Sequence, residues 1–183
     1  MGEEDFDGSI LRYDSAVNVI DVWIAANLCD INMKKNGERQ LDGQGFRLRA
    51  AGICTRLEGS RLQILLVSCS KDEHIWVIPG GGIEVNEDEQ SAALREVLEE
   101  AGVVGKIVKR VGEFKDEERR HRTAVFILSV IEELREWEDG YCGRKRQWMT
   151  IEEGIKRVKA SQTVILKHIM NGFDQYASTK PLV

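Results

Sequence analysis

One predicted helix, over residues 89–101, limits the fold more than any other segment of the chain. At about 100° per residue, this helix has an apolar stripe formed by Leu94, Val97, Leu98 and Ala101. Such a stripe must face a core, so the helix has to pack against a sheet or against other helices. The opposite arc carries the carboxylates of Glu96, Glu99 and Glu100.

These carboxylates repel one another, because Glu96 and Glu100 are one helical turn apart. Arg95 alone cannot neutralise all of them, so the pattern predicts a further cation beside the helix. Carboxylate oxygens suit Mg²⁺ or Mn²⁺ and argue against a thiolate or imidazole site. The alternative is a solvated helix face, which is the usual explanation of an isolated Glu-x-x-Glu-Glu string.

The segments around this helix alternate between strand and helix patterns. We predict strands at residues 49–57, 62–69, 74–78, 106–115, 123–131 and 147–150, and one or two helices over 151–173. Asn86 with Glu89 is typical of an N-cap and its partner, and Gly102 is expected to end the helix. The fold class is therefore α/β or α+β with a mixed sheet.

A glycine run precedes the predicted helix. Pro79 fixes the end of a strand, and a loop is expected at Gly80, Gly81 and Gly82. Without Cβ atoms, these residues let the backbone approach phosphate oxygens and donate N–H groups to them. A lone glycine run would more often be a flexible turn.

The chain of 183 residues is long enough for one domain with an appendage. We predict an N-terminal extension over residues 1–38, a catalytic domain over 39–176 and a tail over 177–183. The extension is either an amphipathic helix or a weakly ordered leader.

The net charge of −5 argues against a general nucleic-acid coat or a polybasic membrane binder. There is no apolar stretch of transmembrane length and no basic signal sequence. Cys29, Cys54, Cys69 and Cys142 lack the spacing of a zinc site or a disulfide framework. We therefore expect a cytoplasmic protein, with a nuclear location also open, and assume a monomer.

The glycine run and the helix together form the string Gly81-x5-Glu87-x7-Arg95-Glu96-Val97-x-Glu99-Glu100-x-Gly102-Val103. This string resembles the Nudix box, G-x5-E-x7-R-E-U-x-E-E-x-G-U, at every position. The resemblance implies an α/β/α sandwich around a mixed sheet and hydrolysis of a diphosphate linked to another group. It further implies Glu96, Glu100 and the Gly80 carbonyl as metal ligands, Glu99 as the catalytic base, and Arg95, tied to Glu87, as a residue that orients carboxylates.

Basic clusters occur outside the box, at residues 118–122 and 143–148 and at Arg47 and Arg49. Arginine forks bind phosphate, so a substrate with many phosphates explains local clusters on an acidic protein better than solvated loop charges do. The flanking segments 45–51, 76–84, 119–123, 136–139 and 143–148 resemble one Nudix branch, the diphosphoinositol polyphosphate phosphohydrolases.

The branch resemblance implies a set of substrate-binding residues. They are Arg39, Arg47, Arg49, Ser70, Lys71, Gly80, Gly81, Gly82, Arg119, Arg120, His121 and Arg144. The chain departs from the branch at Leu48 and Gln162, where basic residues are usual, and at Lys71, where an arginine is usual. These departures should weaken the grip on the most phosphorylated inositols.

The expected function is metal-dependent removal of the β-phosphate from diphosphoinositol polyphosphates, with diadenosine polyphosphates as further substrates. One alternative puts a dinucleoside polyphosphate or a capped RNA end first and needs an aromatic platform, for which Trp76, Phe114 and Trp137 are candidates. The non-enzymatic alternative is an inositol-phosphate binding module. It would gain nothing from carboxylates that face its anionic ligand.

Overall fold

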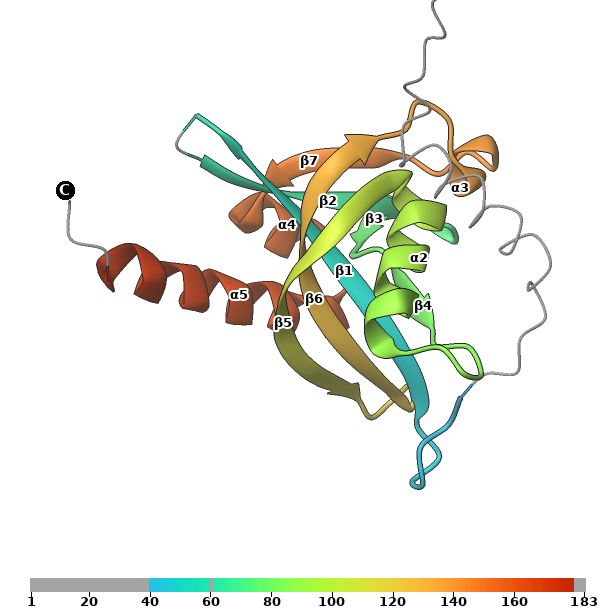
Figure 1. Cartoon of the computed structure of the whole chain (residues 1–183). Coiled ribbons are helices and arrows are strands. Elements are labelled where there is room, and N and C mark those ends of the chain that lie inside the picture. Colours follow the sequence, from blue (N-terminus) through green and yellow to red (C-terminus); the bar gives the residue numbers. More distant parts are fainter. Residues whose placement is uncertain (1–39, 60, 180–183) are drawn as a thin grey trace, which may run out of the picture. The chain divides into compact units, whose positions relative to one another are not determined.

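The computed structural model describes residues 40–59 and 61–179, all of which belong to one unit, Glu38–Val183 (Figure 1). The predicted N-terminal extension, Arg39 and Cys29 lie outside the described residues. The elements in chain order are β1 (Arg47–Glu58), β2 (Arg61–Cys69), β3 (Asp72–Val77), β4 (Gly80–Gly82), α2 (Glu89–Ala101), β5 (Val103–Asp116), β6 (His121–Glu133), α3 (Glu138–Tyr141), β7 (Arg146–Thr150), α4 (Ile151–Arg157) and α5 (Ala160–Thr179).

The strands form one seven-stranded mixed sheet with the order β3-β2-β1-β6-β5. Strand β4 pairs with β1, and β7 pairs with β2. The β1–β6 pair is parallel, and the other pairs are antiparallel. The central position of β1 explains its nearly continuous buried run, because both faces of this strand are covered.

The two faces of the sheet are buried against different helices. Alternate residues of β1 point to opposite faces, so Ala50 and Cys54 join the core beneath α2, whereas Ala51 and Ile53 join the core beneath α4 and α5. Figure 1 shows α2 on one side of the sheet and α5 on the other. The predicted α/β/α sandwich is therefore confirmed.

Helix α2 spans Glu89–Ala101, the bounds that the sequence predicted. The predicted N-cap at Asn86 is wrong: the cap is Asp88, whose carboxylate accepts the N–H groups of Gln90 and Ser91. Asn86 instead lies in the turn before the cap, with a φ of 67°. Gly102 ends the helix in the left-handed conformation, with a φ of 61°, which costs glycine little.

The glycine run differs from the sequence prediction, and the closing region resolves a choice between one helix and two that the prediction left open. The glycine run, expected as a loop, is strand β4, in which Gly80–Gly82 pair with Ala51–Arg49 of β1. The closing helical region is two helices, because Val158 leaves α4 in an extended conformation before α5 begins. Nothing in the local sequence indicated the short helix α3.

Within the described part of the chain, no helix is both long and apolar enough to cross a membrane. Cys54, Cys69 and Cys142 are free thiols.

Candidate active site

Strand β4 is a thin partition between acidic and basic side chains. A Cβ atom on Gly81 would overlap the carboxylate of Glu96 from α2. A Cβ atom on Gly82 would lie 2.7 Å from the guanidinium of Arg47, on the opposite face. Only glycine fits at these two positions, because side chains crowd β4 from both faces. The backbone of β4 alone therefore separates Glu96 of α2 from Arg47 of β1.

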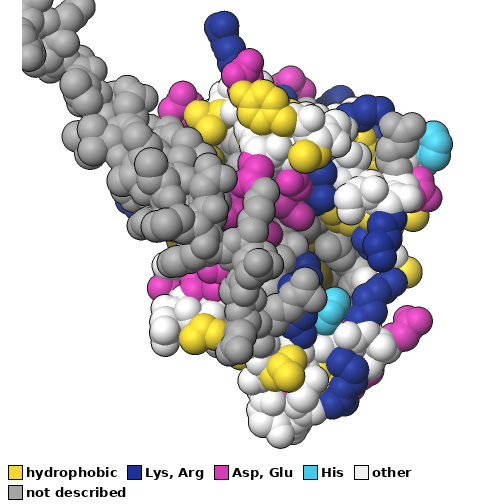
Figure 2. Space-filling model, turned by 90° about the vertical axis from the view of Figure 1, so that its right-hand side faces the viewer, with side chains coloured by type: hydrophobic (Ala, Val, Ile, Leu, Met, Phe, Trp, Pro, Cys, Tyr) yellow, Lys and Arg dark blue, Asp and Glu magenta, His cyan; other side chains and the backbone are white. Residues whose placement is uncertain are grey.

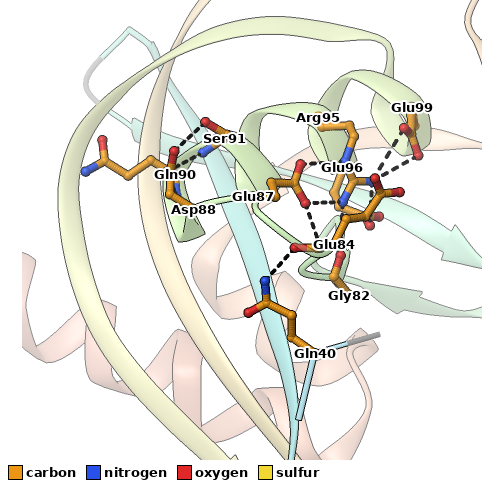
Figure 3. A network of polar contacts seen from close by, with 10 residues as sticks. All are labelled: Gln40, Gly82, Glu84, Glu87, Asp88, Gln90, Ser91, Arg95, Glu96 and Glu99. Carbon is orange, nitrogen blue, oxygen red and sulfur yellow. Dashed lines mark hydrogen bonds and ion pairs between the residues drawn. The ribbon is translucent and has the colours of Figure 1, made fainter. Parts of the chain in front are cut away.

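The Arg95 guanidinium organises the acidic side of this partition (Figure 3). It forms a two-pronged ion pair with Glu87, at 2.8 and 2.9 Å, as the family resemblance implies. It also donates to the Gly82 carbonyl at 2.9 Å and pairs with Glu96 at 2.9 Å. Arg95 thus ties the loop before α2, strand β4 and the carboxylates of α2 into one unit.

Glu96, Glu99 and Glu100 differ in how firmly they are held. Glu96 is 9% exposed and is paired with Arg95. Glu100 accepts the Gly80 N–H at 2.9 Å and pairs with Arg144 at 2.7 Å. Both oxygens of Glu99 lie 3.5 Å from Arg95, so this carboxylate is the most loosely held of the three.

The carboxylates lie in an environment that opposes their negative charge. Burial raises the pKa of Glu99 to about 7, despite the attraction of Arg95. Burial also raises the pKa of Glu100 to about 7, although Arg144 and the Gly80 N–H favour its charged form. The pKa of Glu96 is raised for the same reason, against the pull of Arg95 and Arg49. The nearby arginines therefore do not fully offset the cost of burying charge on these carboxylates, and a further cation would lower that cost.

The helix pattern placed Arg95 alone beside these carboxylates, but a second arginine also reaches them. Arg144, more than forty residues away in the sequence, supplies a second cation to Glu100 and lies 3.6 Å from Asp139. Its side chain is only 10% exposed. The local helix pattern gave no sign of this long-range ion pair.

In the form described, no group of three or more His, Cys, Asp or Glu side chains within residues 40–59 and 61–179 is arranged to hold a metal ion. The donor chemistry nevertheless fits a hard divalent cation, because Glu96 and Glu100 flank β4 with carboxylate oxygens and are incompletely neutralised. The Gly80 carbonyl accepts from Arg49 at 2.7 Å, which leaves it a second lone pair. Loading would require these carboxylates to exchange arginine contacts for the metal.

A cavity of about 310 Å³ opens on the other side of β4. Its basic lining comes from four regions of the chain: Arg49, Lys71, Lys115, Arg119, His121 and Lys159. Strand register explains part of this convergence, because Arg49 pairs with Thr123 and Asp116 pairs with His121 on the same face of the sheet. Figure 2 shows basic side chains lying beside acidic ones on one face of the molecule.

The electrostatic balance of the cavity is strongly positive. Burial, Arg49 and Arg47 hold the pKa of His121 below its usual value, and the carboxylate of Asp116 only partly opposes them. Asp116 is itself engaged with Arg119 at 3.1 Å. The cavity is therefore suited to an anion with several charged groups.

The structure brings some of the predicted substrate-binding residues together and separates others. Arg49, Lys71, Gly80, Arg119 and His121 line the cavity, whereas Arg47 lies beside Gly82 and is not part of the lining. Arg120 points elsewhere: it stacks over Phe46 at 4.1 Å and donates to the Gln44 carbonyl. Ser70 is exposed in the turn after β2 and does not line this cavity.

Sequence reasoning missed three cavity residues that surround the start of α5. Lys159 and Ser161 were not singled out, and Gln162 was noted only as a departure from the branch. The Gln162 side-chain oxygen accepts the Ile78 N–H at 2.9 Å, so it holds α5 against the chain entering β4. The sequence prediction gave no helix boundary inside residues 151–173, so nothing in it marked Lys159 as preceding a helix.

Of the three candidate aromatic platforms, only Phe114 lines the cavity, where its edge meets His168 at a centroid distance of 5.7 Å. Trp76 packs against the core beneath α4 and α5. Trp137 donates to the Glu100 carbonyl and stacks against Arg146.

A mixed sheet between helical layers, with helix carboxylates set against a glycine-only strand, defines a Nudix-type domain. A model of the NUDIX domain matches residues 46–169, and the chain belongs to the Nudix family.

The chain is also similar to curated relatives over most of its length. It is 42% identical over 140 residues to diphosphoinositol polyphosphate phosphohydrolase 2 of Mus musculus, covering 76% of this chain and 78% of the relative. It is 44% identical over 138 residues to diphosphoinositol polyphosphate phosphohydrolase 3-alpha of Mus musculus, covering 74% and 84%. The predicted family and branch resemblance are therefore confirmed.

Solved structures share the fold at lower identity. A crystal structure of the C. elegans Ap4A hydrolase superposes with a TM-score of 0.54 at 18% identity, covering 69% of this chain and 97% of that one. A mutT/nudix family protein from Listeria innocua gives a TM-score of 0.54 at 18% identity, covering 78% and 100%.

Proposed function

We propose that this protein hydrolyses the phosphoanhydride of diphosphoinositol polyphosphates and removes the β-phosphate, with diadenosine polyphosphates as further substrates. The observation that carries the proposal is a cavity with six basic side chains separated from the α2 carboxylates by glycine strand β4. The similarity to relatives named for diphosphoinositol polyphosphates supports the same substrate class.

In this proposal the cavity binds the phosphates that are not cleaved. Hydrogen-bond donors come from Arg49 of β1, from Arg119 in the turn before β6 and from His121 of β6. The backbone of β4 can approach the diphosphate closely because its glycines carry no Cβ atoms. Several converging cations offset the cost of desolvating such an anion. The scissile anhydride then lies across β4 toward α2.

Glu96 and Glu100, with the Gly80 carbonyl, would hold Mg²⁺ or Mn²⁺. When bound, such an ion supplies acidification of water and neutralisation of charge that develops on phosphate oxygens. Arg95 holds the carboxylates and the Gly82 carbonyl in position through its short contacts with Glu87, Glu96 and Gly82.

Glu99 is the proposed general base. Its two oxygens are held at 3.5 Å from Arg95, more loosely than the shorter contacts of Glu96 and Glu100. A carboxylate held this loosely can turn toward water and take its proton at an Oε atom. Arg95 would keep the side chain near the site in both positions.

One observation favours the alternative in which a dinucleoside polyphosphate comes first. Phe114 lines the cavity and offers an apolar surface to a nucleobase beside Ile78 and Ile165. The six basic side chains in the same space favour the more highly phosphorylated ring, so we place the diphosphoinositol first.

A phosphate-release assay tests the ranking. The full chain is incubated with a diphosphoinositol polyphosphate or with a diadenosine polyphosphate, each with Mg²⁺ and each over a substrate range that gives kcat/KM. We expect a higher kcat/KM for the diphosphoinositol. A higher value for the dinucleotide would favour the alternative, and turnover of neither would contradict the proposed function.

A further inference from the structure

We propose that Lys159 is a specificity-determining residue that binds a phosphate remote from the cleaved bond, and that it provides the charge that Gln162 does not. This inference rests on the proposed function. It concerns the start of α5, where Lys159, Ser161 and Gln162 line the cavity.

Backbone hydrogen bonds hold Lys159 in place at the start of α5. It lies between α4 and α5, and its carbonyl accepts the N–H groups of Gln162 at 2.8 Å and Thr163 at 3.2 Å. These bonds fix its backbone at the first turn of α5. The side chain is half-buried and lines the cavity together with Lys71.

The acidic groups near Lys159 are engaged elsewhere. Among the residues that the structure describes, no carboxylate forms an ion pair with Lys159. Asp116, the one carboxylate in the lining of the cavity, is engaged with Arg119. The ammonium group lies near the Cys69 thiol, a weak partner that a phosphate would readily replace. Among the described residues, no acidic side chain therefore competes with a ligand for Lys159.

The neighbouring side chains of Gln162 and Ser161 already make hydrogen bonds within the protein. Gln162 is used to hold Ile78, and Ser161 accepts from Arg119 at 3.3 Å. Lys159 is thus the residue of this turn that brings a full positive charge to the cavity. The N-terminal end of a 20-residue helix adds a favourable dipole for an anion held there.

The position of Lys159 in the cavity determines which part of the substrate it would contact. The cavity joins Gly80, at the carboxylate side, to the start of α5. A ring that carries phosphates on several sides can reach both ends at once. The Lys159 contact should therefore affect the binding of the ring and leave the cleavage step nearly unchanged.

The experiment measures binding of inositol hexakisphosphate, which has no anhydride to cleave, to the full chain by calorimetry. Lys159→Gln is compared with Lys156→Gln, which removes the same charge from an exposed position of α4. We expect about a tenfold rise in Kd for Lys159→Gln, the usual effect of losing a charge-assisted hydrogen bond, and little change for Lys156→Gln. The double variant Lys159→Gln with Gln162→Lys should recover most of the lost affinity.

Turnover provides the second readout. Lys159→Gln should raise KM for the diphosphoinositol with little change in kcat, and it should raise KM for the diadenosine polyphosphate less. If wild type binds the hexakisphosphate but Lys159→Gln binds it as well as Lys156→Gln does, the inference is wrong and the proposed function stands. If wild type does not bind it, the proposed function itself is contradicted.

Discussion

The Glu96 carboxylate occupies the space that a side chain on Gly81 would need. Gly81→Ala should therefore displace Glu96, with a fall in kcat of about 100-fold, because small misplacements of reacting groups have effects of this size. Overpacking should also lower the free energy of unfolding by about 1–3 kcal/mol. Gly43→Ala is the matched control, since nothing lies within 4 Å of the added Cβ. Equal kcat values for the two variants, measured with the thermal midpoint of each, would contradict the crowding argument.

Replacement of the proposed base separates catalysis from binding. Glu99→Gln should lower kcat by about 100- to 10,000-fold, because the amide cannot accept the proton of water, while the affinity for inositol hexakisphosphate is retained. Glu89→Gln, on the same helix but paired with exposed Arg110, should leave both quantities close to wild type. Normal turnover by Glu99→Gln would assign the base elsewhere.

Arg144 pairs with Glu100 on the carboxylate side and is also a predicted substrate-binding residue, so its replacement tests both roles. Arg144→Ala leaves Glu100 without the guanidinium at 2.7 Å, which should raise the pKa of Glu100 further and lower kcat. KM should rise more for the diphosphoinositol than for the diadenosine polyphosphate. Steady-state kinetics on both substrates provide the check: equal rises in KM would contradict a role of Arg144 in selecting the diphosphoinositol.

The depressed pKa of His121 predicts proton uptake on ligand binding. Burial, Arg49 and Arg47 keep the imidazole neutral without ligand, and a bound polyanion opposes these arginines and raises the pKa. The site should therefore take up protons at pH values between the lowered pKa of His121 in the free protein and its higher pKa in the complex, and the affinity for inositol hexakisphosphate should increase as the pH falls through that interval.

Calorimetry in buffers of different ionisation enthalpy measures this uptake. His121→Gln should reduce it, whereas replacement of exposed His74 by Gln should not. The same uptake in His121→Gln as in wild type would assign the proton to another group.

Metal binding is tested directly by titration with Mg²⁺ and Mn²⁺ in the presence of inositol hexakisphosphate. Uptake of at least one of the ions is expected, and Glu96→Gln and Glu100→Gln should each weaken it, because both remove a carboxylate ligand. Glu89→Gln again serves as the control. Absence of uptake by the wild-type chain would contradict the metal-dependent mechanism.

The predictable parts of the site were those determined by local periodicity. The carboxylate arc of α2 follows from the helical repeat alone, and so does the burial of Val97 and Ala101. The cap was misassigned because Asn86 and Asp88 both suit the role, and the choice depends on how the loop approaches the helix.

The parts that could not be predicted depend on tertiary contacts. Strand β4 has no side chains to give a strand pattern, and its pairing with β1 comes from the fold. The Arg144–Glu100 ion pair joins two elements that are distant in the sequence. Lys159 enters the cavity only because α5 docks beneath the sheet, and no local pattern encodes that docking.

The glycine partition also separates two kinds of evolutionary constraint. Changes among Lys71, Arg119 and Lys159 can alter which anion is selected, because these residues belong to the wall opposite α2. Changes in α2 act on bond cleavage instead. One peptide layer thus allows selectivity to diversify while the hydrolytic chemistry stays the same.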